Sequence, residues 1–447
     1  MESFLIAVAS MAVVLGIMIL VHELGHFAAA KFFGVRVDVF SIGFGKRLIG
    51  FRRGETDYRI SALPLGGYVK MAGENPLEAR SGAPDEFMSH PRWQRFVIAI
   101  AGPAMNILLA VGLLTGVYMV HYEHPVYFDQ PAVIGWVLDN SPAAKADIQA
   151  GDRIVRIDGV QNPTWEDVLL KVAIDSNQPL NVAVQRGNQI LEKQVKPEHA
   201  GNDPDQYRTI GWVQDEPITV TQLEPSMPAA KAGIQLGDQI VGINGIPVRS
   251  LFSVIHYLQQ SGNKPVEITA VRNGQELHFT ATPVMTDENG QKRYRLGFQS
   301  EPVHVDKLPL AQALNRSIAD NKKYSLLIVE LVHKMLRRET SIKQMEGPIG
   351  IARASGQAAR QPGWTPLLSL MAGISLNLGI FNLLPIPILD GGMILMLIIE
   401  GIIRRDISMR IKERIYQTAF VFLVLFAVVV IYNDIMKALP GLAQRLP

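Results

Sequence analysis

The sequence predicts an α-helical membrane protein with four transmembrane helices, a β-hairpin region after the first helix, and two small α+β domains between the second and third helices. Composition is the first observation behind this fold class, because 48% of the 447 residues are hydrophobic and only 19% are charged. About a quarter of the residues of a soluble domain are charged. The other two observations are four long apolar stretches and an internal repeat in the polar segment between the second and third stretches.

The four apolar stretches are 19 to 25 residues long, lack Asp, Glu, Lys and Arg, and comprise residues 3–21, 96–120, 365–389 and 415–433. About 20 such residues in an α-helix cross the roughly 30 Å hydrocarbon core of a bilayer. We therefore predict transmembrane helices within residues 1–33, 96–120, 365–400 and 415–433. The first stretch lacks the basic start and the small-residue cleavage site of a signal peptide, so we expect it to remain in the protein.

Lysine and arginine residues flank these stretches unevenly. Ten lie in residues 34–95 and five in residues 403–414, whereas none lies in residues 121–144. The positive-inside rule then places residues 34–95 and 400–414 in the cytoplasm, and both termini and the 121–364 segment on the outer side. In a bacterium with two membranes, this predicts a multi-pass protein of the inner (cytoplasmic) membrane with a periplasmic outer segment.

The outer segment contains a repeat, because residues 141–160 recur as residues 227–246 with 13 of 20 positions identical. Each copy predicts a short helix after a proline, a Gly-Asp turn, a strand and an Asp-Gly or Asn-Gly turn. The pattern resembles tandem bacterial PDZ domains, here residues 126–217 and 218–304. PDZ domains bind extended peptides or protein C-termini by strand addition, although spacer domains with a filled groove are the alternative. Residues 305–364 are expected to form amphipathic surface helices and a linker.

Residues 34–95 contain alternating apolar and polar positions at 35–45, and a second alternating segment with a Gly-Gly break at 56–71. This pattern predicts a β-hairpin next to the end of the first transmembrane helix. Its sheet edge offers a place where an extended substrate adds as a further strand. The alternative is a cytoplasmic hairpin that only connects the first two helices.

A metal-binding pattern, His22-Glu23-Leu-Gly-His26, ends the first apolar stretch. On a helix, His22 and His26 project from one face and can hold a zinc ion, while Glu23 lies beside it to deprotonate water. The chain has no Cys, so any metal must be held by His and carboxylate ligands. The alternative is a belt of polar side chains that face lipid headgroups.

Asp390 is the predicted third ligand, because catalytic zinc usually has three protein ligands and one open position. It interrupts the third apolar stretch, 25 residues after its start, much as His22 comes 19 residues after the start of the first. Both stretches run inward, so both residues are expected toward the cytoplasmic leaflet. Pro385 and Pro387 predict a break in the helix just before Asp390, and irregular backbone at membrane depth is tolerated where it lines a cavity.

Together, His-Glu-x-x-His and the later Asn-x-x-Pro-x-x-x-Leu-Asp-Gly resemble the site-2 protease family of intramembrane zinc metalloproteases. The PDZ-like pair resembles its bacterial subgroup, the regulator of sigma-E protease (RseP) type. The resemblance implies zinc ligands at His22, His26 and Asp390 and a general base at Glu23. It further implies oxyanion-stabilising or substrate-positioning amides at Asn382 and Asn377, and a substrate-binding role for Pro385, Gly43, Phe44 and Gly45. For Asn377, an interhelical hydrogen bond is the alternative.

The function implied is cleavage of the transmembrane segments of single-pass membrane proteins, such as anti-sigma factors in a sigma-E stress response, and of signal-peptide remnants. A net charge of +2 gives no indication of nucleic-acid binding. Two other hypotheses remain. One is a membrane-anchored soluble zinc protease whose third ligand is Asp38 or Glu55, and the other is a non-catalytic PDZ scaffold or chaperone.

Overall fold

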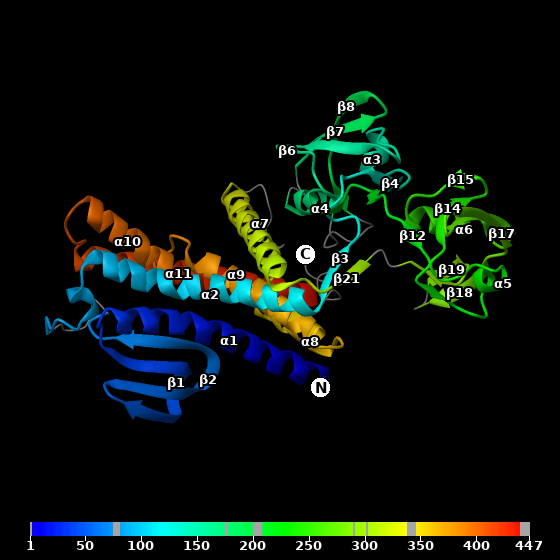
Figure 1. Cartoon of the computed structure of the whole chain (residues 1–447). Helices are drawn as coiled ribbons and strands as arrows, with labels where there is room; N and C mark the ends of the chain where they lie inside the picture. Colours follow the sequence, from blue (N-terminus) through cyan, green and yellow to red (C-terminus); the bar gives the residue numbers. More distant parts are fainter. Residues whose placement is uncertain are drawn as a thin grey trace. The chain divides into compact units, whose positions relative to one another are not determined.

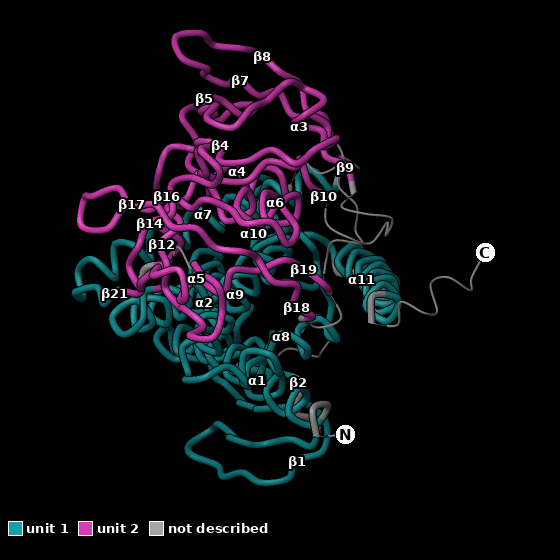
Figure 2. The backbone as a smooth tube through the Cα atoms, turned by 90° about the vertical axis from the view of Figure 1, so that its right-hand side faces the viewer, with its two compact units in different colours: residues 1–122, 306–335, 341–447 teal, residues 123–305, 336–340 magenta. Residues whose placement is uncertain are grey.

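The protein forms two compact units in a computed structural model that describes residues 2–74, 81–174, 178–199, 208–288, 291–300, 303–337 and 346–438. Unit 1 comprises Met1–Tyr122, Asp306–Met335 and Ser341–Pro447, and unit 2 comprises Glu123–Val305 and Leu336–Thr340. Figure 2 colours the two units teal and magenta. Arg80, which contributes to the charge pattern of residues 34–95, lies outside the described residues.

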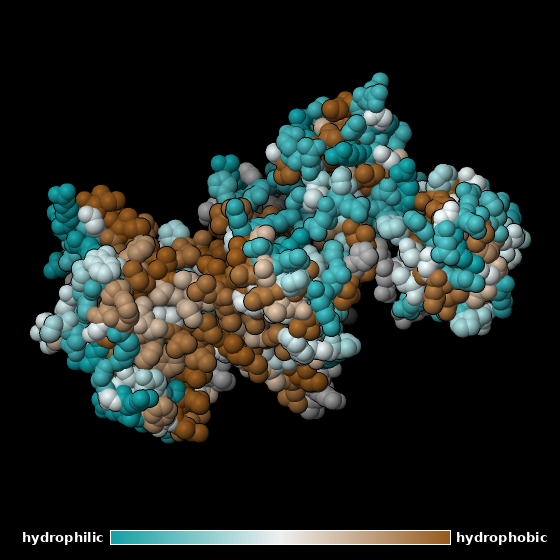
Figure 3. Space-filling model, viewed as in Figure 1, coloured by the Kyte–Doolittle hydropathy of each residue, from teal (hydrophilic) through white to brown (hydrophobic). Residues whose placement is uncertain are grey.

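Unit 1 is mainly helical. Its helices are α1 (Glu2–Phe32), α2 (Arg92–Val120), α7 (Leu310–Leu336), α8 (Pro348–Arg360), α9 (Thr365–Asn382), α10 (Asp390–Ile402) and α11 (Met409–Ala438), with a 3-10 turn at Phe87–Ser89. Among the described residues, four helices are long and apolar enough to cross a membrane, at Leu5–Phe32, Arg92–Val120, Thr365–Asn382 and Arg410–Met436. They match the four predicted stretches, and hydrophobic residues gather over this unit in Figure 3.

Helix α2 packs between α1 and α9, and Figure 1 shows these helices running side by side. Small residues permit the close approach, because a side chain on Gly25 would clash with the carbonyl of Ala101, and one on Gly102 would clash with the ring of His26. Lipid tails are as apolar as leucine, so packing through small residues rather than hydrophobicity holds such helices together.

The third apolar stretch is broken, as its prolines predict. The predicted break lies just before Asp390. In the structure the break is longer, because α9 already ends at Asn382 and α10 begins at Asp390. A side chain on Gly391 would clash with the carbonyls of Leu383 and Leu384, which face the start of α10. The break therefore folds tightly and delivers Asp390 on the first turn of a new helix.

The predicted hairpin is present as strands β1 (Val37–Arg53) and β2 (Thr56–Met71). Its strand pairing is more complex than that of a simple hairpin, because residues 39–42 pair with residues 67–70 on one side and with residues 57–60 on the other. Residues 49–53 pair in turn with residues 56–60. The pairing leaves residues 67–71 at one edge of the sheet, against α1.

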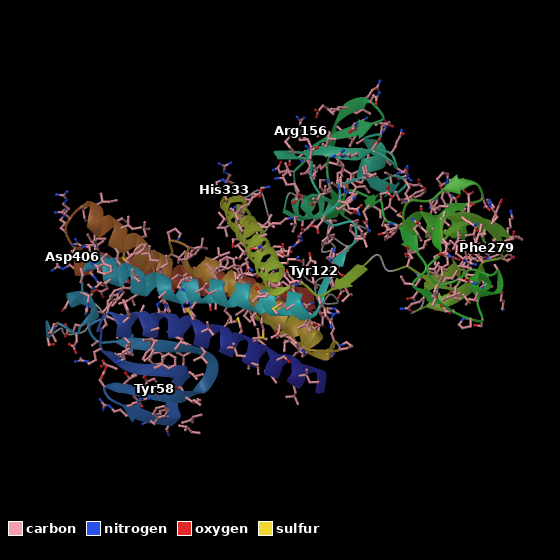
Figure 4. The ribbon with its side chains drawn as sticks, viewed as in Figure 1. Tyr58, Tyr122, Arg156, Phe279, His333 and Asp406 are labelled. Atoms are coloured by element: carbon pink, nitrogen blue, oxygen red, sulfur yellow. The ribbon has the colours of Figure 1, made fainter. Side chains whose placement is uncertain are left out.

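The two arginine-rich segments meet at one end of unit 1. Arg92, at the start of α2, donates a 2.7 Å hydrogen bond to Asp406, and Lys412 forms a buried 2.7 Å ion pair with Glu400. Figure 4 labels Asp406 at this end and Tyr122, which follows α2, toward the other. The contact between Arg92 and Asp406 thus joins the two segments at one end of unit 1.

Helix α7 lies within residues 305–364, where amphipathic helices are expected, and its N-terminal half packs on α2. Tyr118 donates a 2.8 Å hydrogen bond to Asp320, and Ser317 donates one of 2.8 Å to the carbonyl of Val111. The apolar side chains of Leu326 and Val329 in its second half are exposed. Leu310, Leu314 and Ile318 of its first half are exposed as well, so α7 keeps an open apolar face along its length.

Unit 2 holds the repeat as two small α+β domains with separate buried cores. Strands β3 (Tyr122–Pro125) and β21 (Val303–Asp306) pair with each other in a sheet of their own. The first domain contains β4 (Ile134–Val137), α3 (Pro142–Lys145), β5 (Arg153–Ile157), β6 (Val160–Gln161), α4 (Trp165–Ile174), β7 (Leu180–Arg186), β8 (Gln189–Val195), β9 (Glu198–His199), β10 (Arg208–Thr209) and β11 (Trp212–Gln214). The second domain contains β12 (Ile218–Thr219), β13 (Gln222–Leu223), α5 (Pro228–Lys231), β14 (Gln239–Ile243), β15 (Ile246–Pro247), α6 (Leu251–Ser261), β16 (Val266–Arg272), β17 (Gln275–Ala281), β18 (Val284–Glu288), β19 (Gln291–Arg295) and β20 (Phe298–Gln299). The main sheets have the strand orders β6-β5-β7-β8 and β12-β14-β16-β17.

The Gly-Asp turn of the repeat has the same partner in both domains. Asp152 accepts two 2.8 Å hydrogen bonds from Arg186, and Asp238 accepts bonds of 2.6 and 2.7 Å from Arg272. Both carboxylates are almost completely buried. The repeated sequence thus encodes a repeated bidentate ion pair that ties the turn to the sheet.

Replacing Asp238 with Asn is expected to lower the free energy of unfolding of the second domain near pH 7, because Arg272 loses its anionic partner. The hydrogen bond from Arg272 lowers the pKa of Asp238, so the wild-type pair stabilises the fold above the unfolded-state pKa and loses this contribution as the pH falls through the folded-state pKa. The difference between variant and wild type should shrink below about pH 4. Hydrogen exchange of residues 218–288 in the full chain measures this difference in stability. Equal exchange of variant and wild type at pH 7 would contradict a stabilising role of the ion pair.

Candidate metal centre

Three predicted ligands converge where α1 meets the start of α10. His22 and His26 lie one turn apart on α1, with 3.2 Å between their Nε2 atoms. Asp390 approaches both, with its Oδ2 atom 3.2 Å from Nε2 of His22 and its Oδ1 atom 3.5 Å from Nε2 of His26. One donor atom from each residue lies within 4.8 Å of the others. Residues 368 positions apart in the chain thus form one candidate ligand set.

The chemistry of this donor set fits a divalent metal ion. Two imidazole nitrogens and one carboxylate oxygen are the donors of a three-ligand catalytic site that keeps a position open. The ring of His26 is oriented for this purpose, because its Nδ1 atom lies 2.8 Å from the carbonyl oxygen of Ile98. A proton on Nδ1 satisfies that carbonyl and leaves the Nε2 lone pair free for a metal.

Glu23 lies beside the ligands in a cavity of about 500 Å³. Its Oε2 atom accepts a 3.0 Å hydrogen bond from the backbone N–H of Val69, on the edge segment of β2. The cavity is also lined by all three candidate ligands, by Gly66 to Val69, and by Leu378 and Asn382 of α9. The edge of the sheet, the candidate base and the ligands therefore share one space.

Other predicted site residues fall into two groups. Asn382 and Phe44 line the cavity, and the Phe44 ring stacks on Tyr68 with 6.0 Å between centroids. Gly43 and Gly45 flank Phe44 with φ values of 89° and 87°, a conformation that favours glycine. Asn377, on an exposed position of α9, and Pro385, exposed in the break, are not among the described residues that line the cavity.

The alternative third ligands lie in other pairs. Asp38 accepts a 3.1 Å hydrogen bond from Arg36, and Glu55 forms an ion pair with Lys31. Neither belongs to the group of candidate ligands found among the described residues. The geometry favours Asp390 over both, as the broken third stretch predicts.

Several residues of this site are missing from the sequence prediction. Asn106 of α2 is completely buried, and its Nδ2 atom lies 3.4 Å from Nδ1 of His22. Glu74 lines the cavity and accepts a 3.2 Å hydrogen bond from the N–H of Met71, and burial raises the pKa of Glu74 to about 7. The sequence does contain a signal for Asn106, because it is a single amide in a stretch without charged residues. The same reasoning singles out Asp390.

Replacing Gly102 with Ala is expected to weaken metal binding by at least about 10-fold, the lower range for losing a group that orients a ligand. The new methyl group would clash with the ring of His26 and displace it. Gly112→Ala is the matched control, because a side chain there on the same helix meets open space. The metal content of both variants is measured after dialysis. Equal retention of metal by the two variants would show that metal binding tolerates displacement of His26.

Comparisons with known proteins cover nearly the whole chain. The sequence profile of peptidase family M50 matches residues 10–426. The chain is 32% identical to "Regulator of sigma-E protease RseP" of Escherichia coli (strain K12), covering 98% of this chain and 100% of that protein. It is 30% identical to "Regulator of sigma E protease" of Haemophilus influenzae, covering 97% and 100%.

Among solved structures, the PDZ domain of the SdrC-like protein from Listeria monocytogenes is similar over 20% of this chain and 90% of that chain, with 20% identity and a TM-score of 0.17. The profile match and the two relatives each extend over nearly the whole sequence. The chain is a membrane protein by its apolar helices, and it belongs to peptidase family M50.

Proposed function

We propose that the protein is an intramembrane zinc metalloprotease that cleaves the transmembrane segments of single-pass membrane proteins. The observation that carries this proposal is the convergence of His22, His26 and Asp390 beside Glu23, inside a cavity between helices that are apolar enough to lie in a bilayer. Ionisable side chains at such depth are costly unless they serve a function. A scaffold protein would have no need of this ligand set.

In this proposal, His22, His26 and Asp390 hold the zinc ion. The chemistry that a bound zinc ion supplies is activation of water at neutral pH and polarisation of the scissile carbonyl. Glu23 takes the proton of the attacking water and later delivers it to the leaving amine. The side-chain amide of Asn382, which lines the same cavity, donates a hydrogen bond to the oxyanion. The roles of Asn377 and Pro385 stay predictions, and their positions give them no support.

The edge of the β1–β2 sheet would hold the substrate in an extended form, because a helix hides its scissile carbonyls in hydrogen bonds. The backbone N–H of Val69 already points from this edge toward Glu23, and an added strand would lie along the cavity. Phe44, between Gly43 and Gly45, would cover the strand. The exposed apolar side chains of Leu48, Ile49 and Phe51 support association of this sheet with the bilayer.

We propose anti-sigma factors and signal-peptide remnants as substrates of this kind, and the name of one relative, "Regulator of sigma-E protease RseP", fits a role in a sigma-E response. We further propose an inner-membrane location with both termini and the PDZ-like domains (126–217 and 218–304) in the periplasm, supported by the contact between Arg92 and Asp406 that joins the two arginine-rich segments at one end of unit 1. The two PDZ-like domains would then capture or exclude the outer stump of a substrate. The second half of α7 would rest on the membrane surface.

Metal removal tests the proposal. Detergent-purified protein is incubated with a synthetic transmembrane peptide, and the products are mapped by mass spectrometry. We expect cleavage inside the apolar segment, loss of cleavage after chelation, and recovery with stoichiometric zinc. A protein that purifies without stoichiometric zinc and leaves the peptide intact after zinc addition would instead be a scaffold.

Replacing Gly43 with Pro is expected to lower the cleavage rate at least about 10-fold without loss of zinc. The substitution would displace the neighbouring Phe44, which would then no longer orient the extended substrate. Proline cannot adopt the φ of 89° found at Gly43. Gly54→Pro is the matched control, with the same kind of strain (φ of 61°) in the distal turn of the sheet. Cleavage rate and zinc content are measured together, and equal rates in the two variants would reject the substrate clamp.

A further inference from the structure

Helix α2 presents one polar group to each of the two histidine ligands. The carbonyl oxygen of Ile98 lies 2.8 Å from Nδ1 of His26, and the Asn106 side chain lies 3.4 Å from Nδ1 of His22. Ile98 and Asn106 are eight residues apart, on the same side of a helix whose chain direction opposes that of α1. Each histidine thus meets one α2 group at the nitrogen that faces away from Asp390.

A neutral imidazole that binds a metal through Nε2 carries its proton on Nδ1, and this N–H needs an acceptor. His26 has such an acceptor in the Ile98 carbonyl. For His22, the group in reach is the Asn106 amide, whose Nδ2 atom is the one nearer to Nδ1. In that orientation the amide donates, and Nδ1 of His22 accepts, which is the tautomer that cannot bind a metal through Nε2.

Rotation of the Asn106 amide about its Cβ–Cγ bond exchanges its nitrogen and oxygen, which occupy nearly the same positions. The Oδ1 atom is buried and has no hydrogen-bond partner among the described residues, so it is free to take that position. The backbone of Asn106 is fixed meanwhile, because Ser375 of α9 donates a 2.8 Å hydrogen bond to its carbonyl. The amide can turn while its helix stays in place.

We propose that Asn106 is the positioning residue of His22: its Oδ1 atom accepts the Nδ1–H of His22 and fixes the tautomer and ring orientation that bind metal. This role rests on the proposed metal site. It explains why an uncharged group that both donates and accepts lies at the centre of an apolar helix. A residue that merely joins helices by a hydrogen bond would stabilise the protein with or without metal.

The test measures zinc affinity by competition with a chromophoric chelator, using full-length protein in detergent. Asn106→Leu and the smaller Asn106→Ala should each bind zinc about 10- to 100-fold more weakly than wild type. Asn106→Asp keeps an acceptor and should restore affinity to within about 10-fold of wild type, as carboxylate partners do for metal-bound histidine. Thr115→Val is the matched control, a buried polar residue on the same helix whose hydroxyl donates, within the described part of the chain, to the carbonyl of Val111.

Two further readouts separate positioning from simple structural support. The melting temperature of the metal-free protein should fall no further in Asn106→Ala than in Thr115→Val, and the visible spectrum of the cobalt-substituted site should change only in the Asn106 variants. Wild-type zinc affinity in both Asn106→Ala and Asn106→Leu would overturn the inference. Wild-type protein that holds no zinc would instead overturn the proposed function itself.

Discussion

Replacing Glu23 with Gln is expected to lower kcat for a transmembrane peptide by about 10⁴-fold, the upper range for losing a general acid–base group. The amide of Gln occupies the same volume and keeps an acceptor oxygen for the N–H of Val69, so the cavity should retain its shape. What it loses is the ability to take a proton from water and return it to the leaving amine. Product formation over hours, followed by mass spectrometry, measures the effect.

The zinc content of Glu23→Gln should equal that of the wild type, because Glu23 is not one of the three candidate ligands. Glu55→Gln is the matched control, an exposed carboxylate close in sequence that pairs only with Lys31 among the interactions of the described residues. It should cleave at the wild-type rate. Residual cleavage by Glu23→Gln above about a tenth of the wild-type rate would remove Glu23 from the role of general base.

Replacing Asp390 with Ala is expected to lower zinc affinity by more than about 100-fold, since even the loss of an outer hydrogen-bond partner costs 10- to 100-fold. Two histidines remain, and the carboxylate that approaches both Nε2 atoms is gone. Cleavage should fall with zinc occupancy and recover only partly at high zinc concentration. Metal analysis and chelator competition on the purified protein measure this loss.

Asp406→Ala is the matched control for Asp390→Ala, because Asp406 also follows the third transmembrane stretch but pairs with Arg92. It should keep stoichiometric zinc. If Asp390→Ala also kept stoichiometric zinc and full activity, the third ligand would have to be another residue, with Asp38 and Glu55 as the first candidates.

Much of the site could be predicted because its signals are local in the chain. His22 and His26 are four residues apart, so any helix places them on one face. Asp390 stands out because it interrupts an apolar stretch, and Pro385 and Pro387 break a helix wherever they occur in one. The repeated Gly-Asp turn likewise predicts two similar domains, although not the Arg186 and Arg272 partners that complete its ion pairs.

The positions of Asn377 and Asn382 illustrate where such reasoning ends. Both are amides in the same short segment of α9, yet Asn382 lines the cavity and Asn377 lies at an exposed position. Their difference depends on how α9 is rotated against α2, which follows from packing at Gly379 rather than from spacing in the sequence. The twofold pairing of residues 39–42 in the β1–β2 sheet also depends on contacts between distant segments.

The sequence by itself determined the four apolar helices, the repeated domains and the identities of the three candidate ligands, because charge, periodicity and motif spacing are properties of neighbouring residues. Only the tertiary structure decided which groups surround those ligands. Ile98, Asn106 and Val69 reach the site because α2 and the sheet edge pack against α1 at a particular rotation and register. Close packing between elements fixes such contacts, and no local pattern in the chain records it.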